Sequence, residues 1–368
     1  MAQGDLGTRL HMKSSDIARL RLSNQRIAGA KFDTPAEAVR WLGAVQAQDY
    51  AGALWAVGMR TAGATEQAVE RAVADREIVR TWPMRRTLHF VAAADVRWML
   101  ELLTPRVLRS YSLHSQQLGL DERAFARGRE LFARALAGGK QLRRTAMYQV
   151  LEAARIPTGG GCGMHILARL AIEGVLCFGA REGKQPTFAL LDEWVPSARR
   201  LEREAALAEL ARRYFTSHGP ATLQDFVWWS GLTTADARAG LESAKSHLVQ
   251  ETAGGQSYWL DPSLQVSKEP AATAHLLPPY DEYTVAYKDR SAVLDPSYAK
   301  RVNTGNGIFS PTIVVNGQVV GLWKRTPRKG ALVITPNPFG KFSKAAERAI
   351  GLAASRYGKF LGASVVLA

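Results

Sequence analysis

The chain contains 368 residues, 46% of them hydrophobic and 22% charged, and its 48 basic against 33 acidic side chains give a formal net charge of +15. This length is too great for one ordinary hydrophobic core and predicts several modules, and no apolar run approaches the roughly 20 residues of a membrane helix, which excludes a membrane-spanning protein. Two cysteines and a polar N-terminus without an apolar signal segment indicate a cytoplasmic protein without a disulfide framework.

The strong positive charge indicates a polyanionic partner, because a surface that neutralises many phosphates binds nucleic acid tightly. An arginine-rich proteome would give the same charge without such a partner. Both explanations stay open at this point, so the charge suggests DNA or RNA without proving it.

The first module is predicted over residues 14–94, after a disordered N-terminus at 1–13. Apolar periodicity predicts a series of helices, and two extended segments follow them, at 77–84 and 87–93. The predicted helices are 15–27, 35–45, 49–60 and 65–75. Helices followed by a β-hairpin are typical of a winged-helix unit, a relative of the helix-turn-helix motif.

The same order of elements recurs twice downstream, in modules at 95–197 and 198–265. The second module begins with bridging helices over 95–137, and its hairpin is predicted around the turn "AREGKQP". In the third, three helices lead into "LVQET", the turn "AGGQ" and "SYWLD". Three units of related order suggest a tandem array of winged helices.

The sequence pattern changes in the last module, at 266–368, where predicted strands separated by turns precede a terminal helix and a short strand. We expect a small barrel or sheet there. The predicted fold class is therefore α+β, with three tandem winged-helix units followed by a C-terminal β-rich, barrel-like domain.

The segment "GAVQAQDYAG" places Gln46 and Gln48 on either side of Ala47, with Asp49 directly after them. Residues i and i+2 point away from each other in a helix but share a face in an extended segment, so the two amides can act together only if the backbone is extended. The sequence allows this, because Asp49 is a good N-cap for the next predicted helix. In the alternative interpretation, the glutamines cap backbone groups where two helices join.

Four segments, in this order, resemble the AlkZ family of bacterial DNA glycosylases: "VQAQDY", "TWPMRRTLHFV", "LLPPYDEYTVAYKDR" and "NGIFSPTIVVNGQVVGLWKR". The resemblance covers nearly the whole chain and implies tandem winged helices with a C-terminal β-domain. It also implies a catalytic motif of glutamine, an apolar residue, and glutamine or aspartate. Gln46 and Gln48 match the glutamine form, which is associated with excision of bulky N7-guanine adducts and with unhooking of interstrand crosslinks.

The chemistry of such a lesion suits two neutral amides. An N7-alkylated guanine already carries a positive charge and leaves as a neutral base without a general acid. The remaining task is to support an oxocarbenium-like sugar and deliver water to C1′. We expect Gln46 and Gln48 to hold that water through their oxygens, without a covalent intermediate. Asp49 is expected to act as an N-cap, with charge stabilisation as the alternative.

Three further residues are candidates for the pocket, each with a structural alternative. Asp281 and Tyr283, in "PPYDEY", are predicted at the start of a strand, where Asp281 either lines the pocket or fixes a turn. His89 is predicted to alternate with its neighbours along a strand, so that it either faces DNA or is a hydrogen-bonded structural histidine.

Two basic turns are candidates for contacts with DNA. The first lies at the tip of a predicted hairpin and contains Lys324, Arg325, Arg328 and Lys329, and the resemblance implies that this hairpin enters a groove. Solvated surface charge is the alternative explanation. Arg85 and Arg86 form the second turn, and the family commonly has glycine where Arg86 stands, which leaves the geometry of this turn open.

The expected function is that of a monofunctional DNA glycosylase, acting as a monomer on double-stranded DNA with alkylated guanine, without metal or cofactor. The alternative is a non-enzymatic winged-helix DNA-binding or regulatory protein. Such regulators usually dimerise to recognise half-sites, whereas this chain is predicted to hold three units of its own. If the winged helices mediated only protein contacts, DNA binding would be weak and insensitive to salt.

Overall fold

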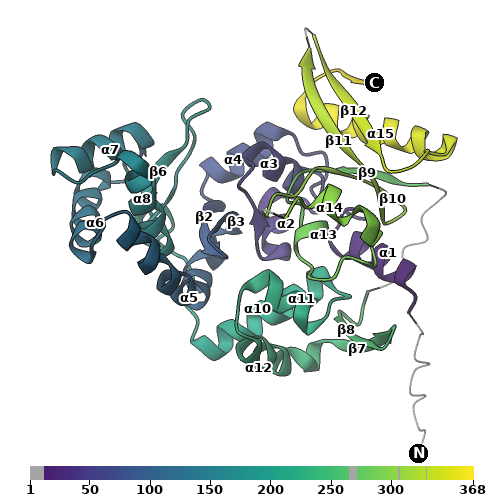
Figure 1. The fold of residues 1–368 in the computed structure, drawn as a ribbon, viewed down its shortest axis with the longest axis horizontal. Coiled ribbons are helices and arrows are strands. Elements are labelled where there is room, and N and C mark those ends of the chain that lie inside the picture. Colours follow the sequence, from purple (N-terminus) through teal and green to yellow (C-terminus); the bar gives the residue numbers. More distant parts are fainter. Residues whose placement is uncertain (1–11, 265–271, 306, 329) are drawn as a thin grey trace, which may run out of the picture. The chain divides into compact units, whose positions relative to one another are not determined.

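The computed structural model describes residues 12–264, 272–305, 307–328 and 330–368 (Figure 1). Within these residues the chain forms two compact units. The first, here called the terminal unit, contains residues 12–31, 208–229 and 233–368, and the second, the central unit, contains residues 32–207 and 230–232. Most of the predicted disordered segment, 1–13, lies outside the described residues.

The central unit contains both helices and short strands. Its helices are α2 (Pro35–Leu42), α3 (Tyr50–Gly58), α4 (Glu66–Ala74), α5 (Val96–Gln117), α6 (Glu122–Leu136), α7 (Arg144–Ala153), α8 (Cys162–Ile172) and α9 (Leu191–Trp194), with 3₁₀ turns η1 (Ala93–Asp95) and η2 (Gly159–Gly161). Its strands are β1 (Val45–Gln46), β2 (Ile78–Met84), β3 (Thr87–Ala92), β4 (Leu142–Arg143), β5 (Leu176–Phe178) and β6 (Thr187–Leu190).

These strands form one six-stranded sheet in the order β1-β3-β2-β5-β6-β4. The two hairpins β2–β3 and β5–β6 were predicted from the sequence as wings of separate units. Here they join edge to edge through the antiparallel pair Arg80 and Phe178. The strand β1 lies at one edge of this sheet, beside β3.

The core of the central unit is built from the apolar faces of α6, α7 and α8 against the β5–β6 hairpin. In α6 the buried positions are Phe125, Gly128, Phe132 and Leu136, the three- and four-residue spacing of one helical face. They pack with buried side chains such as Met147, Ile166 and Phe188. This core supports β2 and β5, and through them the edge of the sheet that carries β1.

The terminal unit brings together both ends of the chain. Its helices are α1 (Ser14–Asn24), most of α10 (Arg203–His218), α11 (Leu223–Ser230), α12 (Thr234–Ala244), α13 (Glu282–Val285), α14 (Ala299–Val302) and α15 (Lys344–Leu361), with 3₁₀ turns η3 (Lys245–His247) and η4 (Pro296–Tyr298). Its strands are β7 (Val249–Ala253), β8 (Gln256–Leu260), β9 (Ala274–Leu277), β10 (Thr312–Val315), β11 (Gln318–Arg328), β12 (Ala331–Pro338) and β13 (Val365–Leu367).

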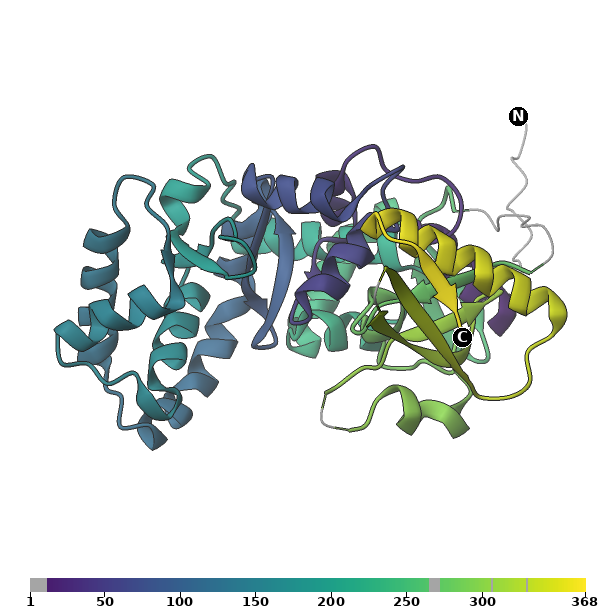
Figure 2. The same cartoon turned by 90° about the horizontal axis from the view of Figure 1, so that it is seen from above.

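The C-terminal strands form a curled five-stranded sheet in the order β13-β12-β11-β10-β9, and α15 lies along one face of it (Figure 2). The buried residues of α15, among them Ile350, Ala353 and Tyr357, follow one helical face. Tyr357 packs edge-on against Trp323 of β11, with ring centroids 5.2 Å apart. The expected C-terminal sheet and terminal helix are both confirmed.

The mixed α and β composition is confirmed, but one predicted element is wrong. The segment "PPYDEYTVAY" does not start a strand: β9 ends at Leu277, and α13 begins at Glu282. Asp281 starts this helix because its carboxylate accepts the Tyr283 N–H at 2.9 Å. The number of winged-helix units stays a prediction. Across the described residues, no helix combines the length and apolar character that a membrane crossing needs.

Candidate functional site

The segment that carries the two glutamines is extended. In β1, Val45 pairs with Phe90 and Gln46 with His89 of β3. The pattern continues past the strand, because the Ala47 N–H donates to the Leu88 carbonyl at 2.7 Å. Ala47 is fully buried. An extended backbone with its middle residue turned inward places Gln46 and Gln48 on the same face, as the sequence predicted.

The two amides are in direct contact. Gln46 Nε2 donates a hydrogen bond to Gln48 Oε1 at 2.9 Å. Gln46 is 8% exposed and sits in the sheet, whereas Gln48, beyond the end of the strand, is exposed. One amide is therefore anchored in the sheet, and it holds the other in a fixed orientation at the surface of the central unit.

Asp49 occupies the N-cap position of α3, but its side chain does not cap the helix. Its backbone is extended, with φ −85° and ψ 101°, and its carboxylate makes no capping hydrogen bond. The backbone carbonyl of Asp49 instead accepts the Ala53 N–H at 2.9 Å. The predicted position is confirmed and the predicted side-chain role is wrong. A half-exposed carboxylate consequently stands directly after Gln48.

Arg80 of β2 contacts the backbone between the two glutamines. Its Nε and Nη2 both donate to the Ala47 carbonyl, at 3.1 and 2.8 Å. The guanidinium lies over the rings of Tyr50, at 5.2 Å, and Phe178, at 4.7 Å. Burial lowers the pKa of Arg80 to about 10, so the side chain stays charged at neutral pH.

Tyr50, the first residue of α3, is in contact with two arginines. Arg80 covers its ring from β2, and Arg181, in the turn after β5, covers it at 4.5 Å. Arg181 is itself paired with Glu70 of α4 at 2.8 Å. Burial and the nearby Glu70 carboxylate raise the pKa of Tyr50, which therefore stays protonated at neutral pH. These contacts connect the glutamine segment to both hairpins of the central sheet.

His89 is fully buried beside Gln46, which supports the alternative of a hydrogen-bonded structural histidine. Arg85 Nη2 lies 3.2 Å from His89 Nε2, and His89 Nδ1 lies 2.9 Å from the Thr87 carbonyl oxygen. Because an arginine can only donate, Nε2 accepts and Nδ1 carries the proton. His89 is thus a neutral histidine that ties the β2–β3 turn to the strand opposite Gln46.

The basic turn between β2 and β3 consists of Arg85 and Arg86, with φ values of 52° and 61°. Positive φ at both positions, between the paired residues Met84 and Thr87, is the geometry of a type I′ hairpin turn, which glycine and asparagine favour. A left-handed conformation costs an ordinary residue about 1–2 kcal/mol. Two arginines therefore occupy a strained turn that glycine or asparagine would adopt more easily.

The guanidinium of Arg86 packs over the ring of Tyr111 of α5, 4.8 Å from its centroid. Tyr111 stacks in turn on His165 of α8, with centroids 4.7 Å apart. Burial, with contributions from His114, Arg86 and Arg169, lowers the pKa of His165 to about 4. The turn is therefore braced against the helices behind it by an aromatic stack whose histidine is neutral at pH 7.

Comparison with known proteins identifies the family. The family model "DNA glycosylase AlkZ-like" matches residues 39–360. The chain belongs to this family. The predicted family and enzyme class, a hydrolase of N-glycosyl bonds, are thereby confirmed.

Two further comparisons give matches from Streptomyces sahachiroi. The chain is 27% identical over 359 residues to a protein named "Interstrand DNA cross-link repair glycosylase", which covers 89% of this chain and 92% of the relative. The solved structure named "Streptomyces sahachiroi DNA glycosylase AlkZ" matches with a TM-score of 0.81 and 24% identity, over 98% of this chain and 100% of the other. At this identity the structural match shows the shared fold.

The predicted pocket residues Asp281 and Tyr283 lie in the terminal unit and are fully buried. Asp281 caps α13, as described above. Tyr283 OH donates to the Gly317 carbonyl at 2.7 Å. Glu282, between them, accepts from Trp229 Nε1 at 2.9 Å. Each of these side chains is buried and hydrogen-bonded within the terminal unit, which supports the structural alternative over a place in a pocket.

The predicted basic hairpin is formed by β11 and β12. Lys324, Arg325 and Arg328 are exposed, and Lys329 lies outside the described residues. Alternation along the strand places Lys324 and Arg328 on one face and Arg325 on the other. Arg325 donates to Tyr357 OH of α15, so this arginine braces the helix. Lys324 and Arg328 are left as the solvent-facing cations of β11.

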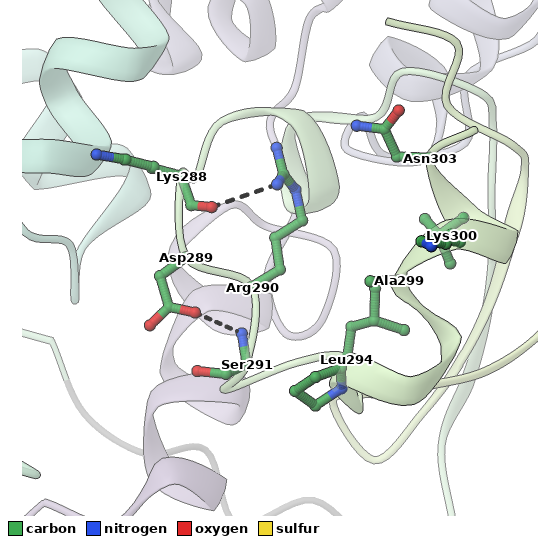
Figure 3. Close-up of a pocket in the computed structure, with 10 residues that line it drawn as sticks. Lys288, Asp289, Arg290, Ser291, Leu294, Ala299, Lys300 and Asn303 are labelled. Atoms are coloured by element: carbon green, nitrogen blue, oxygen red, sulfur yellow. Dashed lines mark hydrogen bonds between the residues drawn. The ribbon is translucent and has the colours of Figure 1, made fainter. Parts of the chain in front are cut away.

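A cavity of about 280 Å³ lies in the terminal unit (Figure 3). Its lining includes Lys288, Arg290, Leu294, Lys300 and Asn303. Arg290 donates to the carbonyls of Thr284, at 2.6 Å, and Lys288, at 3.3 Å, so its guanidinium holds the loop together. The other two cations are exposed lysines. We therefore place the candidate site at the glutamine segment and assign the cavity no part in it.

Sequence patterns did not single out Arg80, Tyr50 or Arg181. Arg80 is 33 residues from Ala47 in the chain, and only the pairing of β2 with β3 and of β3 with β1 brings the two together. The tyrosine of "QAQDY" was the one available signal, because an aromatic ring beside a polar motif often packs against a cation. Among the described residues, no cluster of histidine, cysteine, aspartate and glutamate is arranged to hold a metal ion.

Proposed function

We propose that this protein is a monofunctional DNA glycosylase that hydrolyses the N-glycosidic bond of N7-alkylguanine, including bulky adducts and interstrand crosslinks. One observation carries the proposal: Gln46 and Gln48 contact each other at 2.9 Å on an extended segment, with the second amide exposed. The name of the Streptomyces sahachiroi relative, an interstrand DNA cross-link repair glycosylase, supports the inclusion of crosslinks.

The reaction needs a directed water molecule more than a strong base. The N7-alkylated guanine leaves as a neutral base, and the N-glycosidic bond breaks as positive charge develops on the sugar. The two amide oxygens hold the attacking water, since Gln48 Oε1 keeps one lone pair after it accepts the bond from Gln46. The mutual hydrogen bond fixes this acceptor pair before the substrate arrives, and such positioning contributes to the rate without a change in basicity.

Negative charge beside the sugar would lower the barrier further. Asp49 follows Gln48 directly, and its carboxylate is half-exposed and free of the capping hydrogen bond expected from its position. In this proposal Asp49 faces the oxocarbenium-like sugar and stabilises its charge. Neither glutamine can supply that charge, because both side chains are neutral.

The lesion itself favours an exposed motif. A guanine tethered to the opposite strand cannot swing into a deep pocket as a flipped base does. Gln48 lies at the surface of the central unit, where it can approach a nucleotide that stays in the duplex. The strained Arg85–Arg86 turn and the hairpin cations Lys324 and Arg328 are proposed to bind DNA phosphates. The protein acts as a monomer.

The test is base release from a duplex that carries one N7-methylguanine, followed by alkali to cleave abasic sites. We expect strand cleavage at the modified position and none in the same duplex without the methyl group. A second duplex with an N7-guanine crosslink should be converted into two separable strands. Tight, salt-dependent binding without any base release would support the regulatory alternative and contradict the proposed function.

A further inference from the structure

The hydrogen bonds from Arg80 lie at the point where the sheet stops. β1 ends at Gln46, and the next N–H, that of Ala47, still bonds to β3. The next carbonyl, also of Ala47, is bonded by the Arg80 side chain through two N–H groups, at 3.1 and 2.8 Å. The guanidinium thus takes the place of the strand partner that the ladder no longer supplies.

This arrangement fixes the peptide from which Gln48 departs. The Ala47 carbonyl belongs to the peptide between Ala47 and Gln48, so its direction sets the backbone of Gln48. With the N–H of Ala47 bound by Leu88 and its carbonyl bound by Arg80, neither side of Ala47 can rotate without the loss of hydrogen bonds. The distance between the amides of Gln46 and Gln48 therefore depends on Arg80.

The environment of Arg80 indicates that the residue does more than stabilise the fold. Its guanidinium lies over the rings of Tyr50 and Phe178, and burial lowers its pKa to about 10 without removing its charge. Taking a cation out of water is costly, and an apolar side chain of similar size would often be at least as stable in such a place. An apolar side chain could not donate two hydrogen bonds to the Ala47 carbonyl, as Arg80 does.

We infer that Arg80 is a positioning residue for the hydrolysis: its paired hydrogen bonds to the Ala47 carbonyl hold the Gln46 and Gln48 amides at the separation that directs the water. The inference rests on the proposed function for its kinetic consequence, but its structural content concerns the amide pair alone. A lysine at this position would keep the positive charge but lose the paired hydrogen bonds, because an ammonium lacks the planar geometry of a guanidinium.

The kinetic test compares Arg80→Lys and Arg80→Met with wild type in single-turnover release of N7-methylguanine. We expect Arg80→Met to lose about 10²-fold in rate, as a small misplacement of reacting groups does. Arg80→Lys should fall between this variant and wild type, with the dissociation constant for DNA unchanged in both. The matched control is Arg97→Lys, because Arg97 also donates to a backbone carbonyl of the central unit, that of Gly174 at 3.1 Å.

A rate like that of wild type in folded Arg80→Lys and Arg80→Met would overturn the inference, as would a rate loss explained entirely by weaker DNA binding. If Arg80→Met does not fold, Arg80→Lys alone decides, with its melting temperature compared with that of Arg97→Lys.

A second readout does not depend on activity. In protein with ¹⁵N-labelled glutamine, the side-chain amides of Gln46 and Gln48 should give shifted, exchange-averaged NMR signals in Arg80→Lys and unchanged signals in Arg97→Lys. Unchanged signals in Arg80→Lys would refute the positioning role even if base release were slowed. If wild type released no base, the proposed function would fail, and these amide signals would still test the role of Arg80.

Discussion

Two short segments of this chain combine acidic and aromatic residues but differ in what surrounds their polar atoms. In "PPYDEY" of the terminal unit, Asp281, Glu282 and Tyr283 are fully buried, and each is hydrogen-bonded. In "VQAQDY" of the central unit, Gln48 is exposed, and the Asp49 carboxylate makes no capping bond. Segments of similar composition thus differ in how many of their polar side-chain atoms are buried and hydrogen-bonded inside the fold.

The physical basis of this contrast is the cost of a buried polar group. A buried carboxylate or phenol must find partners inside the fold, and a complete network leaves no atom for a substrate. A functional site keeps donors and acceptors in reserve at the surface and fixes them from behind. In the central unit, Arg80, His89 and the β1–β3 pairing supply that support.

The largest effect is expected when the cation of a buried ion pair in the terminal unit is removed. Arg21 of α1 is 1% exposed, lies 3.7 Å from Asp225 and donates to the Pro220 carbonyl at 2.9 Å. Arg21→Met should lower the free energy of unfolding by about 3–5 kcal/mol, because it leaves a buried carboxylate without its cation. Urea unfolding measures this loss. Arg19→Met, exposed on the same helix, is the control, and equal stability of both variants would contradict the account.

A smaller effect distinguishes Asp49 from a true helix cap. Thr65, which caps α4, accepts the Ala68 N–H at 3.2 Å, so Thr65→Ala should cost about 1 kcal/mol of stability. Asp49→Ala should leave stability nearly unchanged, since its carboxylate makes no such bond, while it slows base release. Thermal unfolding of the two variants tests this. A loss for Asp49→Ala as large as that for Thr65→Ala would restore the capping interpretation.

Glycine variants at two positions of positive φ distinguish backbone strain from a role in DNA binding. Arg86 and Arg155 both have φ 61°, so a change of either to glycine should stabilise the central unit by about 0.5–1 kcal/mol. Only Arg86→Gly should also weaken DNA binding and reduce its salt dependence by about one unit in slope. Binding measured at several salt concentrations gives both slopes. If the two variants bind DNA alike, the Arg85–Arg86 turn does not contact phosphate.

A modest effect of pH is expected from the stack behind that turn. The pKa of His165 is about 4 in the folded protein against an ordinary value of 6.5, so the unfolded chain binds the proton more tightly. The free energy of unfolding is therefore highest above pH 6.5, where His165 is neutral in both states, and it decreases as the pH falls toward 4. Unfolding at a series of pH values should show a shallower decrease in His165→Gln. An identical decrease in both proteins would remove His165 as its source.

The extended glutamine pair could be predicted because it depends on local geometry. Residues i and i+2 share a face only in extended backbone, and α2 ends at Leu42, which leaves room before Gln46 for a strand. The error at "PPYDEY" was also local. Tyrosine, threonine and valine suggested a strand, but aspartate after two prolines is a signal for the start of a helix.

The support behind the pair could not be predicted, because it depends on long-range pairing. The contact of Arg80 with Ala47 requires that β3 lie between β1 and β2, and Arg181 reaches Tyr50 only because the second hairpin joins the same sheet. The sequence patterns placed these hairpins in separate units. No spacing in the chain indicates which edges of two hairpins will meet.

The most direct measurement is single-turnover release of N7-methylguanine by the double variant Gln46→Ala with Gln48→Ala. The account predicts a rate loss of at least about 10²-fold with unchanged DNA affinity, because the amides position water and bind no phosphate. Gln67→Ala, an exposed glutamine of α4, should behave as wild type. Base release by the double variant at the rate of wild type would show that the amide pair does not direct the water.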